Sequence, residues 1–352
     1  MPDMPRLWMR HEARQSERRA PLAPQDARTL IMKGVHLTVE ESQQRVFPAQ
    51  EYVEAGCAIA PQGSWMSHCP VTDYVLGLKA LPDEPARLIH RHIFFGHAYK
   101  GQPGAPCLLG RFVSGGGTLL DLEQLVDAEG HRMVAFGYWA GYAGAALAVL
   151  RHRGTLTAPL APSSREELCA RLAGGRRPGD VTAVVIGANG RAGRGARDAL
   201  LAAGIEPTCW GLDDTRNLDR ATLLAHDILV NTIVSRRPVA PFLTKDDLDD
   251  EQRRLSVIAD VTCDVGSELN ALPVYGHVTD WATPVQRLCE VPRPLDIIAI
   301  DNLPSLVPAE ASRAFSADLW PLLLSLREGS EVWDRCAEAF RRAVTSLGEE
   351  RG

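Results

Sequence analysis

The sequence predicts an α/β protein of two domains, with at least one doubly wound parallel sheet. Its 352 residues are about two domains in length. Short apolar runs alternate with amphipathic stretches, as when helices join parallel strands. Residues 181–216 read as strand, glycine turn, helix and second strand, the first βαβ unit of a dinucleotide-binding fold.

The glycines of this unit have separate roles. Residues 181–186 form an apolar, β-branched run that suits a buried strand. Gly187 allows the tight turn, Gly190 lets backbone N–H groups approach a pyrophosphate, and Gly193 lets the helix close onto the strand. The helix is expected over 196–203. Because the flanking elements are those the motif requires, the sequence predicts nucleotide binding here.

The end of the second strand bears on the choice of cofactor. An acid that grips the adenine ribose normally stands there, but the strand expected over 207–212 ends around Gly211. Asp213 and Asp214 follow slightly late. Arg216 is placed to meet a 2′-phosphate, which the two aspartates would repel. We expect NAD, with NADP left open, and cofactor contacts from Gly187, Asn189, Gly190, Arg191, Ala192, Gly193 and Asp213.

Composition excludes several classes of function. Hydrophobic content of 45% and charged content of 23% are ordinary for a globular protein. The net charge of −6 argues against a nucleic-acid or acidic-membrane surface. No apolar run reaches the length of a membrane span, and no signal-peptide apolar region follows the first methionine. We expect a cytoplasmic monomer or small homo-oligomer that acts on a small molecule.

Cysteine and histidine usage predicts no metal site. The eight cysteines are scattered, without a Cys-x-x-Cys pair, and are interpreted as buried small apolar residues. The histidines at 68, 90, 92 and 97 have no Cys or carboxylate partner at ligand spacing.

Lysine is scarce in this chain. Only four of the 38 basic residues are lysine. Arginine cannot deprotonate, so a retained lysine suggests a role for an amine whose pKa can be lowered. A strand expected over 74–78 delivers Lys79 at its carboxyl end, and one over 90–95 delivers His97 and Lys100. Ligands of open α/β sheets sit beyond the carboxyl ends of strands, so these residues are candidates for the chemistry.

The remaining elements complete two domains. The predicted substrate domain comprises residues 1–137 and 304–352, and the dinucleotide domain residues 138–303. Helices 25–33 and 48–55 are each followed by a glycine stop. Further strands are expected over 7–10, 36–40, 227–231, 255–260 and 296–300, an extended pair over 118–126 and 132–136, and further helices over 137–150, 309–326 and 331–347.

Six segments carry a family resemblance. They are Glu-Arg-Arg-Ala-Pro-Leu-Ala-Pro (17–24), Gly-Leu-Lys (77–79), Phe-Gly-His-Ala-Tyr-Lys (95–100), Thr-Leu-Leu-Asp-Leu-Glu (118–123), Ala-Phe-Gly-Tyr-Trp-Ala-Gly (135–141) and Asp-Asn-Leu-Pro-Ser (301–305). Together they resemble the lysine-forming saccharopine dehydrogenases of the alanine dehydrogenase and transhydrogenase superfamily. The likeness covers nearly the whole chain, in order.

The resemblance implies two Rossmann-like, doubly wound domains with the active site in a cleft between them. It also implies oxidation of the secondary amine of saccharopine by NAD to an imine, which is hydrolysed to L-lysine and 2-oxoglutarate. Lys79 and His97 match the acid–base pair of the family. Arg19, Arg132 and Lys100 match residues at the substrate.

The chemistry accounts for these residue types. Hydride leaves a carbon next to nitrogen only when that nitrogen has a free lone pair, so a base must first take the ammonium proton. A partly desolvated lysine near other cations has a pKa low enough to do so. Histidine can exchange protons as water adds to the imine and the carbinolamine collapses. Arginines hold carboxylates bidentately. Glu123 is predicted to tune the pKa of the pair, and Asp301 to contact the cofactor.

Two departures keep alternatives open. Ala80 stands where the family has a glutamate after the catalytic lysine, and Gly211 stands where it has the ribose-binding acid. The first change favours the neutral amine of Lys79 and opens space. One alternative is a related enzyme that cleaves another N6-substituted lysine or an opine-like secondary amine in specialised metabolism. The other is a non-catalytic nucleotide-binding sensor, against which the retained Lys79 and Lys100 argue.

Overall fold

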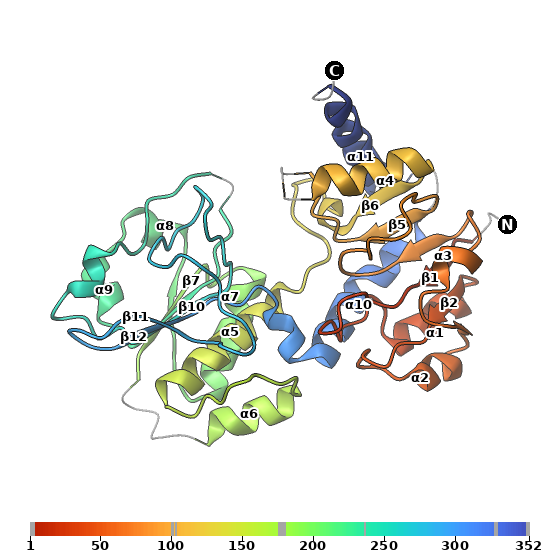
Figure 1. The fold of residues 1–352 in the computed structure, drawn as a ribbon. Helices are drawn as coiled ribbons and strands as arrows, with labels where there is room; N and C mark the ends of the chain where they lie inside the picture. The colour runs from red at the N-terminus through yellow and green to blue at the C-terminus, as the bar shows by residue number, and fades with distance from the viewer. Residues whose placement is uncertain are drawn as a thin grey trace. The chain divides into compact units, whose positions relative to one another are not determined.

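The computed structural model describes residues 4–99, 102, 104–174, 181–235, 237–326 and 330–349. The chain forms two compact units (Figure 1). Unit 1 comprises Met1–Ala135 and Ala311–Gly352, and unit 2 comprises Phe136–Glu310. Each unit contains a six-stranded sheet, which confirms the predicted α/β fold. Among the described residues, the longest apolar helices still fall short of what crossing a bilayer requires.

The sheet of unit 1 is wholly parallel, with the order β3-β2-β1-β4-β5-β6. The direction of winding reverses between β1 and β4, and ligands of open sheets bind beyond such a reversal. The strands are apolar because helices cover them. They are β1 (Arg6–Met9), β2 (His36–Glu40), β3 (Ala58–Ala60), β4 (Tyr74–Leu76), β5 (Arg91–Phe94) and β6 (Thr118–Asp121).

The helices of unit 1 come from both ends of the chain. α1 begins after Ala23, which provides no side-chain cap, and Ser316 of α10 binds the residues at the start of the helix. The Ser316 hydroxyl accepts from Ala23 N at 2.8 Å and donates to Asp26 at 2.5 Å. α11 packs on β6 and α4 (Figure 1). The helices are α1 (Pro24–Met32), α2 (Ala49–Glu54), α3 (Trp65–His68), α4 (Ala105–Gly115), η1 (Leu122–Gln124), α10 (Pro308–Leu324) and α11 (Glu331–Glu349).

The sheet of unit 2 has the order β11-β12-β10-β9-β7-β8. Only β11 runs antiparallel, beside β12 at one edge. β7, β9, β10 and β12 are buried along their whole length, as expected of central parallel strands. The strands are β7 (Ala183–Ile186), β8 (Thr208–Trp210), β9 (Ile228–Asn231), β10 (Val257–Asp260), β11 (Gln286–Cys289) and β12 (Leu295–Ile298).

Small residues set the helix packing of unit 2. The glycine-rich α5 packs on α7, and both helices have glycines where they meet. A Cβ on Gly141 would lie 1.8 Å from Ala192 O, and one on Gly195 would lie 1.9 Å from Tyr138 O. The helices are α5 (Gly137–His152), α6 (Arg165–Ala173), α7 (Arg191–Ala202), α8 (Leu212–Arg216), α9 (Arg220–Leu224), η2 (Asp246–Asp249) and η3 (Leu303–Leu306).

One expected element is wrong. Residues 118–126 and 132–136 do not form an extended pair, because the strand β6 ends at Asp121 and pairs in parallel with β5. The Asp121 carboxylate accepts from Glu123 N at 2.9 Å and caps η1, which turns the chain out of the sheet. Of the expected pairing, a single antiparallel bridge between Val126 and Arg132 is present. The prediction also omitted β3, β11, α3, α4, α6, α8 and α9 and the short helices η1, η2 and η3.

Candidate active site and nucleotide site

The carboxyl ends of three neighbouring strands of unit 1 carry the predicted catalytic residues. Lys79 follows β4, His97 follows β5, and Glu123 lies in η1 directly after β6. Because the strands are parallel and adjacent, all three residues lie at one edge of the sheet. The predicted substrate residue Lys100 lies outside the described residues.

Glu123 joins two other predicted residues. Its Oε1 lies 3.6 Å from His97 Nδ1 and accepts from Arg132 Nη2 at 2.8 Å. The carboxylate is largely buried, whereas the imidazole is half exposed. The His97 ring stacks on Phe95, and its backbone has a left-handed φ of 49°. Such a φ is uncommon outside glycine and is held here by the surrounding contacts. The structure therefore brings together His97, Glu123 and Arg132.

Asp121, two residues before Glu123, is a buried acid that the sequence analysis did not select. Only 1% of it is exposed. Burial, assisted by the charge of Glu123, raises the pKa of Asp121 from 3.8 to about 6. The signal in the sequence was a charged residue that ends an apolar strand. Asp121 therefore adds a carboxyl group with a pKa well above its usual range beside the His97–Glu123 pair.

Arg19 is not on a solvated charged face. It is 3% exposed, and its guanidinium forms a bidentate pair with Glu17, with Nε–Oε1 and Nη2–Oε2 distances of 2.8 and 2.7 Å. Burial would raise the pKa of Glu17, but the hydrogen bonds and charge of Arg19 outweigh it and lower the pKa, with a smaller contribution from Lys79. Glu17 was not among the predicted site residues. It places a carboxylate within electrostatic range of Lys79.

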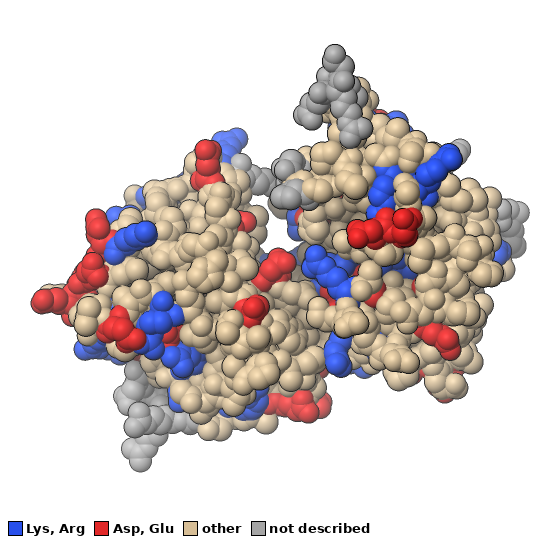
Figure 2. Space-filling view, viewed as in Figure 1, with Lys and Arg blue, Asp and Glu red and all other residues tan. Residues whose placement is uncertain are grey.

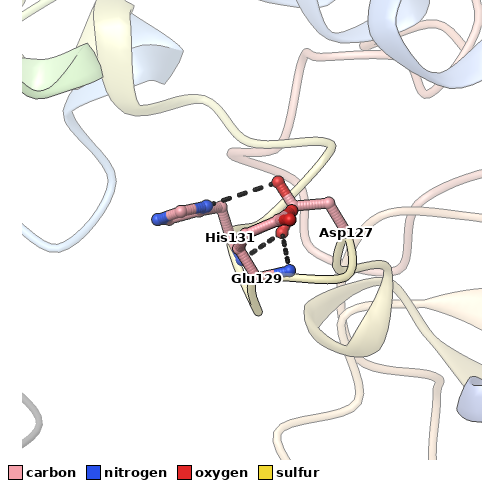
Figure 3. Close-up of side chains that lie close together, drawn as sticks. All are labelled: Asp127, Glu129 and His131. Carbon is pink, nitrogen blue, oxygen red and sulfur yellow. Dashed lines mark hydrogen bonds and ion pairs between the residues drawn. The ribbon is translucent and has the colours of Figure 1, made fainter.

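The loop before Arg132 is closed by its own side chains (Figure 3). Asp127 Oδ1 accepts from Glu129 N at 3.1 Å and from His131 N at 2.7 Å, and Asp127 Oδ2 lies 3.3 Å from His131 Nδ1. The ligand atoms of these three residues lie within 4.8 Å of one another. These bonds are those of a tight turn, and we interpret the cluster as a loop clasp that presents Arg132 to Glu123.

The glycine turn of unit 2 has the geometry that the motif requires. Gly187 has a φ of 81°, and a Cβ there would lie 2.8 Å from Thr232 Oγ1. A Cβ on Gly193 would lie 2.2 Å from Gly187 O, so glycine allows α7 to close onto the turn. The turn leads directly into the N-terminus of α7, a helix of 12 residues that begins at Arg191. A helix N-terminus behind a glycine turn suits a pyrophosphate.

The predicted ribose contact lies at the end of β8. Asp214 Oδ2 accepts from Gly211 N at 2.7 Å and caps the short helix α8. The side chain of Asp213 is 94% exposed and lies 3.5 Å from Arg216 Nη1. Both aspartates are exposed, but Asp214 is bound to the backbone of Gly211, whereas the Asp213 side chain extends into solvent beside Arg216. The other predicted contact, Asp301, is exposed in the turn before η3.

A buried polar network that the sequence analysis missed stands at the carboxyl ends of β9 and β10. Asp260 accepts from Tyr275 OH at 2.7 Å, from Asn231 Nδ2 at 3.0 Å and from Thr262 Oγ1 at 2.7 Å. Its partners are separated along the sequence, so spacing gave no signal. The network lies beside the glycine turn, because Asn231 ends β9 and Gly187 directly follows the adjacent strand β7.

Charged side chains of both signs lie on the surface of the protein. On the face drawn in Figure 2, the basic and acidic side chains of the described residues are interspersed.

Comparison with known proteins supports a relationship over the full length. The model "Alanine dehydrogenase/PNT, N-terminal domain" matches residues 8–143, and "Alanine dehydrogenase/PNT, C-terminal domain" matches residues 177–348. Proteins named saccharopine dehydrogenase (NAD(+), L-lysine-forming) are similar in sequence. That of Emericella nidulans is 38% identical, with 97% of this chain and 98% of the relative covered. That of Schizosaccharomyces pombe is 37% identical, with 97% and 99% covered.

Solved structures support the fold. An L-alanine dehydrogenase matches with a TM-score of 0.69 at 18% identity and covers 99% of this chain and 100% of its own. A transhydrogenase from Sinorhizobium meliloti matches with a TM-score of 0.64 at 16% identity and covers 91% and 94%. Identities this low carry information about the fold alone.

Proposed function

The chain belongs to the saccharopine dehydrogenase family, within the alanine dehydrogenase/PNT proteins, and we propose that it oxidises saccharopine with NAD to give L-lysine and 2-oxoglutarate. It is an oxidoreductase of the class that acts on CH–NH donors. The full-length relationship supports the substrate. The observation that carries the mechanism is the His97–Glu123–Arg132 cluster at the edge of the sheet where Lys79 emerges.

In the proposed reaction, Lys79 takes the proton of the substrate's secondary ammonium and so frees the nitrogen lone pair. The turn after β7 and the N-terminus of α7 would hold NAD, which would supply the acceptor for the hydride of the adjacent carbon. His97 then removes a proton from the water that adds to the imine carbon, and returns one as the carbinolamine collapses. Glu123, 3.6 Å from His97 Nδ1, orients the imidazole and stabilises its protonated form.

Arginine holds the substrate in this proposal. Arg132 is partly exposed and already binds a carboxylate, that of Glu123, at 2.8 Å. A substrate carboxylate is the same kind of ligand, so binding would draw Arg132 toward the substrate and leave Glu123 to His97. Arg19 is tied to Glu17, and its part in substrate binding, like that of Lys100, stays a prediction.

The residues of unit 2 fit a dinucleotide. The turn after β7 and the N-terminus of α7 would hold the pyrophosphate through Gly187, Gly190 and the residues that follow. Asp213, whose side chain faces solvent at the end of β8, would meet the adenine ribose. NAD is favoured over NADP, since Asp213 and Asp214 would repel a 2′-phosphate.

The test is the absorbance of reduced nicotinamide with purified protein, saccharopine, and NAD or NADP in separate cuvettes. We expect rapid reduction of NAD, and its loss in Lys79→Met. Lys33→Met is the matched control, since Lys33 is an exposed lysine at the end of α1. Binding of NAD without turnover of saccharopine would show that saccharopine is not the substrate. Full activity of Lys79→Met would overturn the mechanism. The cytoplasmic location and oligomeric state remain predictions.

A further inference from the structure

The backbone leaves the sheet just before Lys79. β1 and β4 pair as far as Met9 and Leu76, and Arg10 N then donates to Leu76 O at 2.9 Å. Beyond this bond the two chains diverge, so the N–H groups of Leu78 and Lys79 have no carbonyl of β1 opposite them. Buried backbone donors need partners. The Glu12 carboxylate, which follows β1, supplies both acceptors, and Arg10 beside it binds the carbonyl of Lys79.

Glu12 binds both donors. Its Oε1 accepts from Leu78 N at 2.7 Å and its Oε2 from Lys79 N at 2.9 Å. Only 5% of Glu12 is exposed, so water does not compete for the carboxylate. Bonds from backbone N–H groups to a buried carboxylate are charge-assisted and strong. Glu12 therefore holds the amide end of Lys79.

Arg10 binds the carbonyl end. Its Nη2 donates to Lys79 O, and its Nη1 lies 3.4 Å from Glu12 Oε2. Arg10 is 1% exposed, and the loop wraps closely around its guanidinium. A Cβ on Gly77 would lie 2.5 Å from Arg10 Nε, so this close approach requires glycine. The two buried charges compensate each other, and both side chains bind the backbone of Lys79.

We infer that Arg10 and Glu12 are positioning residues that fix the direction in which Lys79 presents its amine. Both backbone groups of Lys79 are bound by buried, mutually paired side chains, so the direction of its Cα–Cβ bond is set. Neither residue has to touch the substrate. The inference rests on the proposed function, in which Lys79 is the base. It assigns a catalytic purpose to a buried pair that would otherwise be structural.

Glu12→Gln is the informative change. The glutamine side chain keeps the shape and one acceptor oxygen, but its amide nitrogen cannot accept from the second backbone N–H. If Lys79 is held less firmly, its amine is less often in position to take the proton. We therefore expect kcat to fall by about 10- to 100-fold, with the Kd for NAD unchanged. Arg10→Lys, which keeps the charge but loses the fork, should lower kcat in the same direction.

Asp73→Asn is the matched control. Asp73 is also a buried acid paired with an arginine, since Arg6 Nε lies 3.1 Å from Asp73 Oδ1, and it links the same two strands at their amino ends. Its loss should lower the thermal unfolding temperature with little effect on kcat. If Asp73→Asn and Glu12→Gln lower kcat equally, the pair near Lys79 is merely structural and the inference falls.

A double-mutant cycle separates the two roles further. If Glu12 acts through Lys79, Glu12→Gln should cause no further loss of kcat in a Lys79→Met background. Ethylamine can replace the missing amine in Lys79→Ala, and this free amine is not attached to the backbone that Glu12 positions. Glu12→Gln should therefore cause no further loss of the rescued activity. Equal losses with and without Lys79 would overturn the inference alone. Full saccharopine oxidation by Lys79→Met would overturn the proposed function as well.

Discussion

Asp121 should make the stability of unit 1 decrease as the pH rises between about 4 and 6. The pKa of this buried carboxyl is raised from 3.8 to about 6 in the folded protein, chiefly by burial. The folded state therefore holds the proton more tightly than the unfolded chain does. The resulting stabilisation is complete below the unfolded pKa and is lost as the pH rises through the folded one. Asp121→Asn removes this titration.

The size of the effect follows from the two pKa values. They differ by about 2.2, and each pKa unit corresponds to about 1.36 kcal/mol, which gives about 3 kcal/mol. Asparagine keeps an oxygen that can accept from Glu123 N, so the η1 cap is retained. The unfolding free energy of Asp121→Asn relative to the native protein should therefore increase by about 2 kcal/mol between pH 4 and pH 7, since part of the full difference lies below pH 4.

Amide hydrogen exchange of β5 and β6, corrected for the intrinsic rate at each pH, is the appropriate assay. It reports local stability, whereas two units need not unfold in one transition. Asp127→Asn is a control of opposite sign, because bonds from His131 N lower the pKa of Asp127 and its stabilisation is lost as the pH falls. A stability difference for Asp121→Asn that is the same at pH 4 and pH 7 would refute the reasoning.

Three further changes have defined outcomes. Glu17→Gln leaves the buried Arg19 without its bidentate carboxylate and should destabilise unit 1 by about 3–5 kcal/mol in urea unfolding. Gly195→Ala places a methyl group 1.9 Å from Tyr138 O, so it should force α5 and α7 apart, lower the thermal unfolding temperature and weaken NAD binding. Asp213→Ala should raise the Kd for NAD by about tenfold in calorimetry, equivalent to about 1.4 kcal/mol.

Each change has a matched control. Glu338→Gln breaks an exposed pair with Arg341 and should cost less than about 1 kcal/mol. Gly110→Ala lies in α4, where a Cβ meets nothing within 4 Å, and should stabilise by about 0.5–1 kcal/mol. Asp214→Ala removes the α8 cap and should affect that helix more than the ribose. Equal tolerance of Gly195→Ala and Gly110→Ala would contradict the close-packing argument.

The strands that could be predicted are those in which a local run of apolar residues indicates burial. β7 is wholly apolar, β9 and β10 are apolar up to a polar last residue, β12 is apolar apart from Asp296, and the structure buries every residue of each. β3 has three residues, and β11 is a partly exposed edge strand that begins with Gln286 and Arg287, so neither carries that signal. Residues 118–136 were misjudged because a capping side chain, Asp121, outweighed the apolar run that continues beyond it.

In the candidate site too, local sequence predicts some features, whereas others depend on tertiary structure. The places of Lys79 and His97 followed from the ends of strands, which is local information, whereas Glu123 was expected inside an extended stretch and lies in η1. Their partners did not, because the contacts are long-range or depend on burial. The bond from Leu78 to Glu12 spans 66 residues, and no spacing rule connects them. Arg19 stood in a run of charges that looked exposed, and only tertiary packing around Glu17 makes it buried.

Ala80 stands where the family has a glutamate, and the charges around Lys79 predict what restoring that glutamate would do to the reaction. Three arginine–glutamate pairs stand at this edge of unit 1, with N–O distances of 3.4 Å for Arg10–Glu12, 2.7 Å for Arg19–Glu17 and 2.8 Å for Arg132–Glu123. Paired charges contribute little net field, so a glutamate at position 80, where the side chain is exposed, would add a negative charge without a matched cation. It would stabilise the ammonium form of Lys79. Ala80→Glu should therefore shift the acid limb of the kcat/KM profile for saccharopine upward by about 1 pH unit. Ala80→Gln, which adds the same bulk without charge, should leave the limb in place, and an equal shift in both variants would show that size, not charge, matters at this position.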